Sequence, residues 1–395
     1  MAAPTDRTIV ILAGARTPFG KFGGALKDLS ATDLGVVAAQ AAIKRSQVRA
    51  ENIDHVIFGN ALQTSADAIY LARHIGLRAG IPQSTPALTL NRLCGSGFQS
   101  IITAAQMLLL GDAEFVLAGG TESMSQAPHV IRNARWGIAL GEEGKIEDSL
   151  WSALTDGYCD LSMAHTAEKL AAKYGVARKE ADEFAYQSQM RTKLALESGR
   201  LGQEIVPIDS ALQRDEHPRP ETTREGLGAL KPVFKKDGVV TAGNASGICD
   251  GAAAVILTTE ENAEKYQLKA AVKIRSWGIT GCEPSMMGIG PASAIRAALE
   301  RAQLRLDQID LIEVNEAFAA QYLAVERELG LNRERVNVNG GAIALGHPLG
   351  ATGARITVTL MYELHRRGAR FGLGSACIGG GQGIALLIEN IRQAI

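Results

Sequence analysis

Residues 85–123, TPALTLNRLCGSGFQSIITAAQMLLLGDAEFVLAGGTES, decide the fold. An apolar strand ends at the turn Cys94-Gly95-Ser96-Gly97, an apolar helix follows, and a second apolar strand runs into a pair of glycines. Strands that are apolar on both faces and alternate with helices are typical of sheets covered by helices. The segment therefore predicts an α/β fold.

The last third of the chain repeats this order. IDLIEVNEAF at 309–318 echoes IDHVIFGNAL at 53–62, and residues 335–381 again read as strand, glycine-rich turn, helix and strand. Nearly the same distance in sequence separates Cys94 from His347. Two related halves packed together would bring these turns to one interface, although any β-α-β sequence can produce such echoes.

The repeat divides the chain into three predicted parts. An N-terminal half comprises residues 1–121 with 250–270, a loop domain is inserted at 122–249, and a C-terminal half covers 271–395. Within the insertion, 177–199 reads as an amphipathic helix ended by Gly199, and the surroundings of Trp136 and Trp151 look like loop. The insertion also carries a run of basic residues that suits either solvated helix faces or an anion site. These are Arg191, Lys193, Arg200, Arg214, Arg219, Arg224, Lys231, Lys235 and Lys236.

Composition excludes several classes of protein. The 395 residues are 46% apolar and 21% charged, with a formal net charge of -1, as in soluble globular proteins with a large core. A near-neutral chain does not suit a general nucleic-acid binder, which carries a basic face. No stretch approaches the roughly 20 apolar residues that span a bilayer. We expect neither nucleic acid binding nor membrane insertion.

The cysteines and the N-terminal segment bear on the compartment. An odd number of cysteines in a long chain fits a reducing compartment better than a disulfide framework. The five are Cys94, Cys159, Cys249, Cys282 and Cys377. The first residues, MAAPTDRTIVILAG, resemble neither a secretory signal nor a cleaved transit peptide. We expect a cytoplasmic location, with the mitochondrial matrix as the alternative.

Cys94 is a candidate nucleophile. A thiol at a helix N-terminus lies near free backbone N–H groups and the positive end of the helix dipole, which favour the thiolate. Gly95 and Gly97 allow a sharp turn and close approach of a ligand. A buried, inert cysteine is the alternative interpretation.

His347 and Cys377 lie in two further glycine-rich turns. The spacing around His347 matches neither a dinucleotide fingerprint nor a Walker sequence, so a base that takes a thiol proton is the stronger chemical interpretation beside a structural role. Cys377 permits a metal site, a redox pair or a second acid/base. Three scattered residues make a poor zinc site, and a redox pair favours C-x-x-C, which leaves the acid/base. Asn315 and Glu316 end a strand and could orient a water or a substrate oxygen, although Asn there is usually a turn former.

Six stretches together resemble the motif set of the thiolase family, in order and over essentially the whole chain. They are NRLCGSGFQS (91–100), GGTESMS (119–125), TAGNASGICDGAAA (241–254), VNEAFA (314–319), NVNGGAIALGHPLGATGAR (337–355) and SACIGGGQG (375–383). Residues 61–82 are further similar to mitochondrial-type 3-ketoacyl-CoA thiolases of fatty-acid β-oxidation and their bacterial relatives; they read ALQTSADAIYLARHIGLRAGIP. The resemblance implies a thiolase fold, a duplicated five-layered αβαβα arrangement with an inserted loop domain covering the CoA site. It also implies a homodimer or homotetramer.

The resemblance assigns catalytic roles by position. Cys94 resembles the nucleophile that becomes acylated, His347 the base that activates it, and Cys377 the acid/base at the substrate α-carbon. Asn315 would hold a water that forms one oxyanion hole with His347. The backbone N–H groups of Cys94 and Gly379 would form the other. No metal and no cofactor are implied, because CoA and acyl-CoA are substrates.

Contacts with CoA also follow from the resemblance. Ala245, Ser246 and Gly247 would contact the pantetheine arm, together with Phe318, and Arg219 would approach the nucleotide end. Met163 and Met287 match positions that shape the acyl pocket, where flexible thioethers accommodate different chains.

One departure concerns substrate specificity. Several short-chain biosynthetic thiolases have a His immediately before the equivalent of Met163, whereas this chain has Ser162, and His165 does not align. The expected activity is therefore acetyl-CoA C-acyltransferase or C-acetyltransferase, with the acyl chain left open. The alternatives are another condensing enzyme of the same fold and a non-catalytic acyl-CoA-binding protein. The second cysteine argues against the former, and the complete Cys94, His347, Cys377 set argues against the latter.

Overall fold

A computed structural model describes residues 7–208 and 211–391 of the chain. The far ends of the predicted halves, residues 1–6 and 392–395, lie outside this range. The main sheet has ten strands in the order β12-β13-β14-β11-β1-β10-β5-β3-β4, with β2 beside β10. Their bounds are β1 Ile9–Arg16, β2 Gly20–Lys21, β3 His55–Gly59, β4 Ala87–Leu90, β5 Phe115–Ser123, β10 Cys249–Thr259, β11 Val272–Gly281, β12 Leu311–Val314, β13 Phe371–Ile378 and β14 Gln382–Asn390.

The sheet divides into two halves between β1 and β11. These strands pair only where Val10 meets Lys273 and Ile11 meets Val272, whereas β11 pairs with β14 along nearly its whole length. On the N-terminal side, β10 joins β1 to β5 in antiparallel pairing, and β5, β3 and β4 are parallel. The chain after the insertion therefore returns to the N-terminal sheet through β10 before starting the second half.

Alternating side chains of the N-terminal strands serve two separate cores. In β1, Ile9 and Ile11 join the core that contains α3 (Ser96–Leu110) and α13 (Thr352–Arg367). Val10 and Leu12 point to the opposite face, under α1 (Ala31–Ser46) and α2 (Leu71–Arg78). This period of two is what a strand covered on both faces requires.

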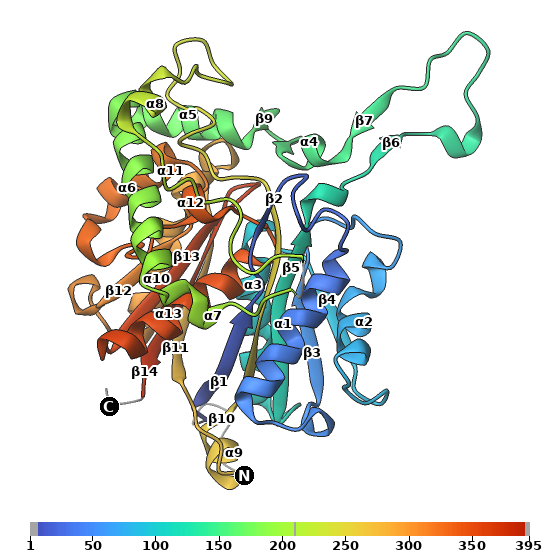
Figure 1. Ribbon diagram of the computed structural model, residues 1–395, viewed down its shortest axis with the longest axis vertical. Coiled ribbons are helices and arrows are strands. Elements are labelled where there is room, and N and C mark those ends of the chain that lie inside the picture. Colours follow the sequence, from blue (N-terminus) through green and yellow to red (C-terminus); the bar gives the residue numbers. More distant parts are fainter. Residues whose placement is uncertain (1–6, 209–210, 392–395) are drawn as a thin grey trace.

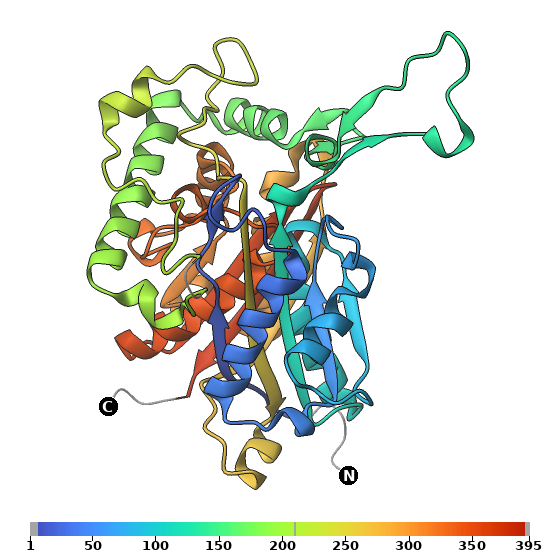
Figure 2. The same ribbon diagram turned by 45° about the vertical axis from the view of Figure 1, so that its right-hand side comes forward.

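The C-terminal strands alternate in the same way. Leu386 and Ile388 of β14 face α3 and α13, while Ala385 and Leu387 pack under α10 (Gly290–Ala302) and α11 (Ala319–Leu329). The layers are thus α1 and α2, the N-terminal strands, α3 and α13, the C-terminal strands, and α10 and α11 (Figures 1 and 2). The predicted five-layered αβαβα fold is confirmed.

The central helix α3 explains the most apolar stretch of the chain. The expectation that no stretch is long and apolar enough to span a bilayer is wrong by length and composition, because within the described residues the helical segment Leu93–Leu110 meets both conditions. Phe98, Ile101 and Ile102 are fully buried against both halves of the sheet. A core position between two sheets accounts for this composition.

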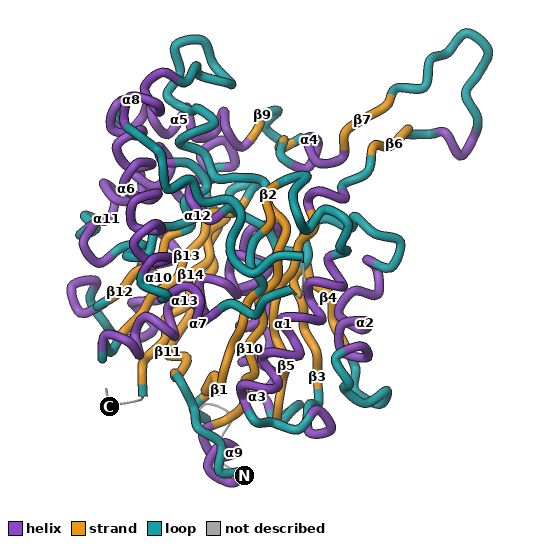
Figure 3. Tube along the Cα trace, in the orientation of Figure 1, coloured by secondary structure: helices purple, strands orange, loops and turns teal. Residues whose placement is uncertain are grey.

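The insertion forms helices over one edge of the sheet and an extended arm (Figures 1 and 3). The predicted helix at 177–199 is confirmed as α6 (Arg178–Glu197). The arm carries β6 (His129–Ile131) and β7 (Ile146–Asp148), with Trp136 exposed between them. The expectation of loop around Trp151 is wrong, because the Asp148 carboxylate caps a short helix there.

The α-helices and strands not yet named, within the insertion and beyond it, are α4 Ser149–Ala153, β8 Thr155–Asp156, β9 Leu161–Ser162, α5 Met163–Tyr174, α7 Arg200–Glu204, α8 Arg224–Ala229, α9 Glu260–Lys265 and α12 Ala342–Leu345.

Candidate active site

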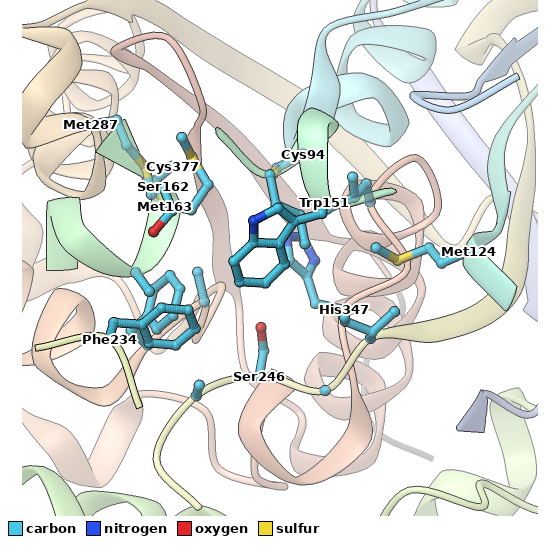
Figure 4. Close-up of a pocket in the computed structure, with 18 residues that line it drawn as sticks. Cys94, Met124, Trp151, Ser162, Met163, Phe234, Ser246, Met287, His347 and Cys377 are labelled. Atoms are coloured by element: carbon cyan, nitrogen blue, oxygen red, sulfur yellow. The ribbon is translucent and has the colours of Figure 1, made fainter. Parts of the chain in front are cut away.

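One pocket brings together most of the predicted site residues (Figure 4). Cys94, His347, Cys377, Met163, Met287, Ala245, Ser246, Gly247 and Phe318 line it. The other lining residues are Met124, Trp151, Leu154, Ser162, Ala164, Phe234, Ile248, Ala317 and Leu349. Apolar side chains therefore form most of the wall, and the reactive groups are two thiols and one imidazole.

Cys94 lies in the 3-10 turn Leu93–Gly95, directly before α3. The preceding Leu93 has a φ of 48°, a left-handed conformation that is costly for a residue with a branched side chain. The Asn91 Oδ1 accepts the Leu93 N–H at 2.8 Å, and the Ser96 hydroxyl donates to the Leu93 carbonyl at 2.7 Å. These hydrogen bonds hold the strained turn in place at the pocket.

The Cys94 thiol is protonated in the free protein. Burial, with a smaller effect of the Glu122 carboxylate, raises its pKa to about 11 against the opposing effect of the Gly379 N–H and its own N–H. The side chain reaches the pocket surface, but most of its surroundings are protein. The loss of hydration therefore raises the pKa more than the helix N-terminus lowers it. The expectation of a favoured thiolate is wrong for the free protein. Attack by this sulfur requires a base.

His347 is the base within the same pocket. Its Nδ1 lies 2.6 Å from the Thr352 hydroxyl, and its Nε2 lies 3.3 Å from the Asn315 side-chain amide nitrogen. Burial, together with the positive charge of Arg355, lowers its pKa to about 3. The imidazole is consequently neutral near pH 7, which leaves one ring nitrogen able to accept a proton.

Cys377 reaches the pocket from the end of β13 and is fully buried. Burial raises the pKa of its thiol well above the usual range, and the adjacent Cys94 raises it further. Its neighbours Met287 and Ala317 are apolar. The two sulfurs thus enter one pocket from different halves of the fold, both as thiols.

Asn315 and Glu316 end the same strand but face different surroundings. Asn315 adjoins His347, and its Oδ1 is buried without a hydrogen-bond partner in the described part of the chain. Glu316 lies away from the pocket, where its carboxylate accepts from the Ser188 hydroxyl at 2.7 Å and the Asn337 amide at 2.8 Å. The prediction that Glu316 could orient a substrate oxygen is wrong, because protein donors already occupy it.

The predicted pantetheine loop lies along the pocket. The Ser246 N–H donates to the Ala317 carbonyl at 2.9 Å, and Ala245 bridges to Phe318. The His347 N–H donates to the Gly247 carbonyl at 2.9 Å. The loop is therefore bonded directly to the segment that carries the base.

Arg219 lies outside this pocket. It lines a separate hollow with Gln189, His217 and Gly243, and its backbone N–H donates to the Gln189 side chain at 2.9 Å. Gly243 is close in sequence to the pantetheine loop, so the two hollows flank one segment. The predicted CoA contacts thus divide between two hollows.

Sequence reasoning missed an aromatic wall. Trp151 and Phe234 stack with ring centroids 6.1 Å apart and an interplanar angle of 11°. Both line the pocket, but Trp151 lies in the five-residue helix α4 and Phe234 in an irregular segment, and neither is long enough to give a periodic signal. Ser162 caps α5 and bonds His165 Nδ1 at 2.8 Å, while His165 Nε2 lies 3.1 Å from the Phe234 carbonyl. His165 supports this wall and does not line the pocket.

Sequence reasoning also missed Glu122, which joins the two halves beside Cys94. Its fully buried carboxylate accepts from the Asn60 amide at 2.8 Å, the Ala61 and Leu62 N–H groups at 3.0 and 2.9 Å, and the Gly350 N–H at 2.7 Å. Burial raises its pKa to about 7 against the effect of these donors. In the sequence, only its place within GGTES could have indicated it.

Within 7–208 and 211–391, no group of three or more His, Cys, Asp or Glu is arranged to hold a metal ion.

Fold and pocket together define a class: a duplicated αβαβα protein whose two related halves enclose two cysteines and a histidine in one pocket. The chain belongs to the thiolase family, since the family models "Thiolase, N-terminal domain" and "Thiolase, C-terminal domain" match residues 9–261 and 268–390.

Comparison with curated relatives and solved structures agrees with this family. The chain is 56% identical over 391 residues to human mitochondrial 3-ketoacyl-CoA thiolase, covering 97% of this chain and 98% of that protein. It is 48% identical over 394 residues to an acetyl-CoA acetyltransferase of Syntrophomonas wolfei, covering 97% and 99%. The crystal structure of the human enzyme in complex with CoA superposes with a TM-score of 0.97 at 56% identity, covering 99% of this chain and 100% of that one.

Proposed function

We propose that this thiolase cleaves 3-oxoacyl-CoA by thiolysis and accepts acyl chains longer than acetyl. The observation that carries the proposal is one pocket that holds two thiols and a neutral imidazole within an otherwise apolar wall. Each methylene of the substrate that is buried against such a wall adds roughly 0.8 kcal/mol to the free energy of binding, so the pocket favours extended acyl chains. The relative named 3-ketoacyl-CoA thiolase supports the same substrate class.

In the proposed first half-reaction, His347 takes the proton of Cys94 while the sulfur attacks the 3-oxo carbon. The bond between C2 and C3 then breaks, the acyl group stays on Cys94, and acetyl-CoA leaves as its enolate. The Cys377 thiol protonates C2 of this enolate. Cys377 is left as a thiolate, whose charge its buried site tolerates only briefly.

In the second half-reaction, CoA regenerates the enzyme. The Cys377 thiolate takes the proton of the CoA thiol, and the CoA sulfur attacks the acyl-Cys94 thioester. Cys94 leaves as a thiolate and recovers its proton from the imidazolium of His347. Each proton transferred in the first half-reaction is thereby balanced, and the chemistry requires no cofactor beyond CoA.

Two oxyanions need stabilising in this scheme. We assign the Cys94 and Gly379 N–H groups to the oxyanion that forms when Cys94 attacks the carbonyl, since both N–H groups lower the pKa of the Cys94 thiol. We assign His347 and a water held by the unpaired Asn315 Oδ1 to the enolate oxygen of acetyl-CoA. Each preorganised donor is worth roughly 3–4 kcal/mol in the transition state.

The CoA site follows from the loop beside His347. Ala245, Ser246, Gly247 and Phe318 would contact the pantetheine arm, and Met163 and Met287 the acyl group. Arg219, in the neighbouring hollow, would meet the nucleotide phosphates. We further propose a role in fatty-acid β-oxidation, a homodimer or homotetramer as the assembly, and the mitochondrial matrix over the cytoplasm, because relatives 54% to 56% identical to this chain are named mitochondrial.

The competing specificity is acetoacetyl-CoA alone, favoured by the relatives named acetyl-CoA acetyltransferase. Thiolysis of acetoacetyl-CoA and of a long-chain 3-oxoacyl-CoA at equal CoA concentration separates the two. Cleavage of both supports the proposal, whereas cleavage of acetoacetyl-CoA alone assigns the short-chain activity. Cleavage of neither by folded protein with Cys94 reduced would overturn both assignments.

A further inference from the structure

Thr352 bonds directly to the catalytic base. It is the first residue of α13 and lies five positions after His347. Its Oγ1 is 2.6 Å from His347 Nδ1 and 2.9 Å from the Pro348 carbonyl oxygen. Thr352 is fully buried and His347 is 6% exposed, so water does not compete for these hydrogen bonds.

Donor accounting determines the direction of these bonds. A hydroxyl has one hydrogen, and a carbonyl oxygen can only accept, so Thr352 bonds both groups at once only when its hydrogen points to Pro348. The oxygen of Thr352 then accepts from His347 Nδ1–H. On the other side of the ring, Asn315 presents its NH₂ group to Nε2, which is compatible only with a lone pair there. Both contacts select the same tautomer.

The first turn of α13 holds the hydroxyl in place. The N–H groups of Ala351 and Thr352 both donate to the Pro348 carbonyl at 3.0 Å. Gly350, in the same turn, is bonded to the buried Glu122 at 2.7 Å. The segment between His347 and Thr352 is therefore fixed to the helix that follows it and to the opposite half of the fold.

We propose that Thr352 is a positioning residue that keeps His347 protonated on Nδ1, so that Nε2 is free to take the proton of Cys94. This inference rests on the proposed roles of Cys94 and His347. Without the Thr352 acceptor, Nδ1–H would be buried and unpaired, which favours the tautomer with the proton on Nε2. In that tautomer the imidazole cannot deprotonate the nucleophile.

Three variants test the inference. Thr352→Val keeps the side-chain shape and removes the acceptor, while Thr352→Ser keeps the hydroxyl. Thr357→Val is the matched control: Thr357 is equally buried in α13, and its hydroxyl donates to the Gly353 carbonyl at 2.9 Å without meeting a catalytic group. We expect Thr352→Val to lower kcat for thiolysis about 10- to 100-fold with little change in KM, the range found when the partner that orients a metal-ligating histidine is removed. Thr352→Ser should restore most of kcat, and Thr357→Val should leave it near the wild-type value.

The tautomer itself provides a second readout. Histidine ¹⁵N shifts, with the His347 signal assigned by its loss in His347→Asn, should show a protonated Nδ1 in wild type and proton density moved to Nε2 in Thr352→Val. A merely structural role would leave the tautomer unchanged. Wild-type kcat in folded Thr352→Val, or an equal loss in Thr357→Val, would overturn the inference. Activity in Cys94→Ala, measured alongside, would instead overturn the proposed function.

Discussion

Gly97 of α3 and Gly353 of α13 lie in direct backbone contact. A Cβ on Gly97 would stand 2.5 Å from the Ala354 amide nitrogen, and a Cβ on Gly353 would overlap the amide nitrogen of Phe98. The two central helices therefore touch at their N-terminal turns, where Cys94 precedes one helix and His347 precedes the other. Glycine at both positions is what brings the nucleophile and its base to one pocket.

Gly353→Ala should destabilise the protein and impair catalysis together. The added methyl must displace backbone, which typically costs about 1–3 kcal/mol in a packed core. Gly202→Ala is the control, because Gly202 is also in a helix but nothing lies within 4 Å of its Cβ position. Urea unfolding should show a lower midpoint for Gly353→Ala and a midpoint at or above wild type for Gly202→Ala. Equal stability of Gly353→Ala and wild type would contradict the packing described here.

Cys377→Ala should separate acyl transfer to the enzyme from proton transfer at the α-carbon. Exchange of an acyl group between acyl-CoA and labelled CoA forms no enolate, so His347 can pass the proton of Cys94 to the departing CoA sulfur without Cys377, and the exchange should continue. Thiolysis of 3-oxoacyl-CoA should fall at least about 1000-fold, because the enolate lacks its acid. Cys282→Ala is the control, since Cys282 does not line the pocket and its sulfur bonds the Met287 carbonyl at a long distance of 3.9 Å. Loss of both reactions in folded Cys377→Ala would refute separate roles for the two thiols.

Sequence patterns predicted the parts of this fold that periodicity governs. The order of strands and helices, the duplication and the helix at 177–199 followed from alternating and helical spacing of apolar residues. The meeting of Cys94, His347 and Cys377 also followed, because each lies at a glycine-rich turn next to a core element. Such turns are encoded locally.

The remaining features depend on contacts between segments distant in sequence. Glu316 resembles a site residue in sequence, but Ser188 and Asn337, from other elements, donate hydrogen bonds to its carboxylate. Trp151 acquires its place in the pocket only by stacking on Phe234. The protonation state of Cys94 depends on burial by both halves, which a helix-terminus argument does not include.

Trp151→Ala should weaken the binding of acyl-CoA more than it slows the chemistry. The indole lines the pocket and is held there by stacking on Phe234, so its removal would take apolar contact away from a bound acyl chain. KM for a long-chain 3-oxoacyl-CoA should therefore rise about 3- to 10-fold, with kcat nearly unchanged. Trp136→Ala, on the exposed part of the arm, serves as the control and should leave both constants at wild-type values. A larger effect on kcat than on KM would argue against a role in substrate binding.

His347 should make the protein sensitive to acid. Burial lowers its pKa from 6.5 to about 3, so below pH 6.5 the unfolded chain binds a proton at this residue that the folded protein does not. The stability that His347 contributes is therefore complete above pH 6.5 and is lost progressively as the pH falls toward 3. Between pH 6.5 and 4.5, two pH units at about 1.4 kcal/mol each correspond to a loss of roughly 3 kcal/mol.

His347→Asn removes this titration while leaving a polar side chain in the cavity. Its free energy of unfolding should be lower than that of wild type at pH 7, but it should fall less steeply between pH 6.5 and 4.5, by roughly 3 kcal/mol. His129→Asn, at an exposed position on the arm, is the control and should reproduce the wild-type slope. The measurement is urea unfolding across this pH range. Parallel slopes for His347→Asn and wild type would show that the folded protein protonates His347 as readily as the unfolded chain does. Such a result would contradict the neutral imidazole that the activation of Cys94 requires.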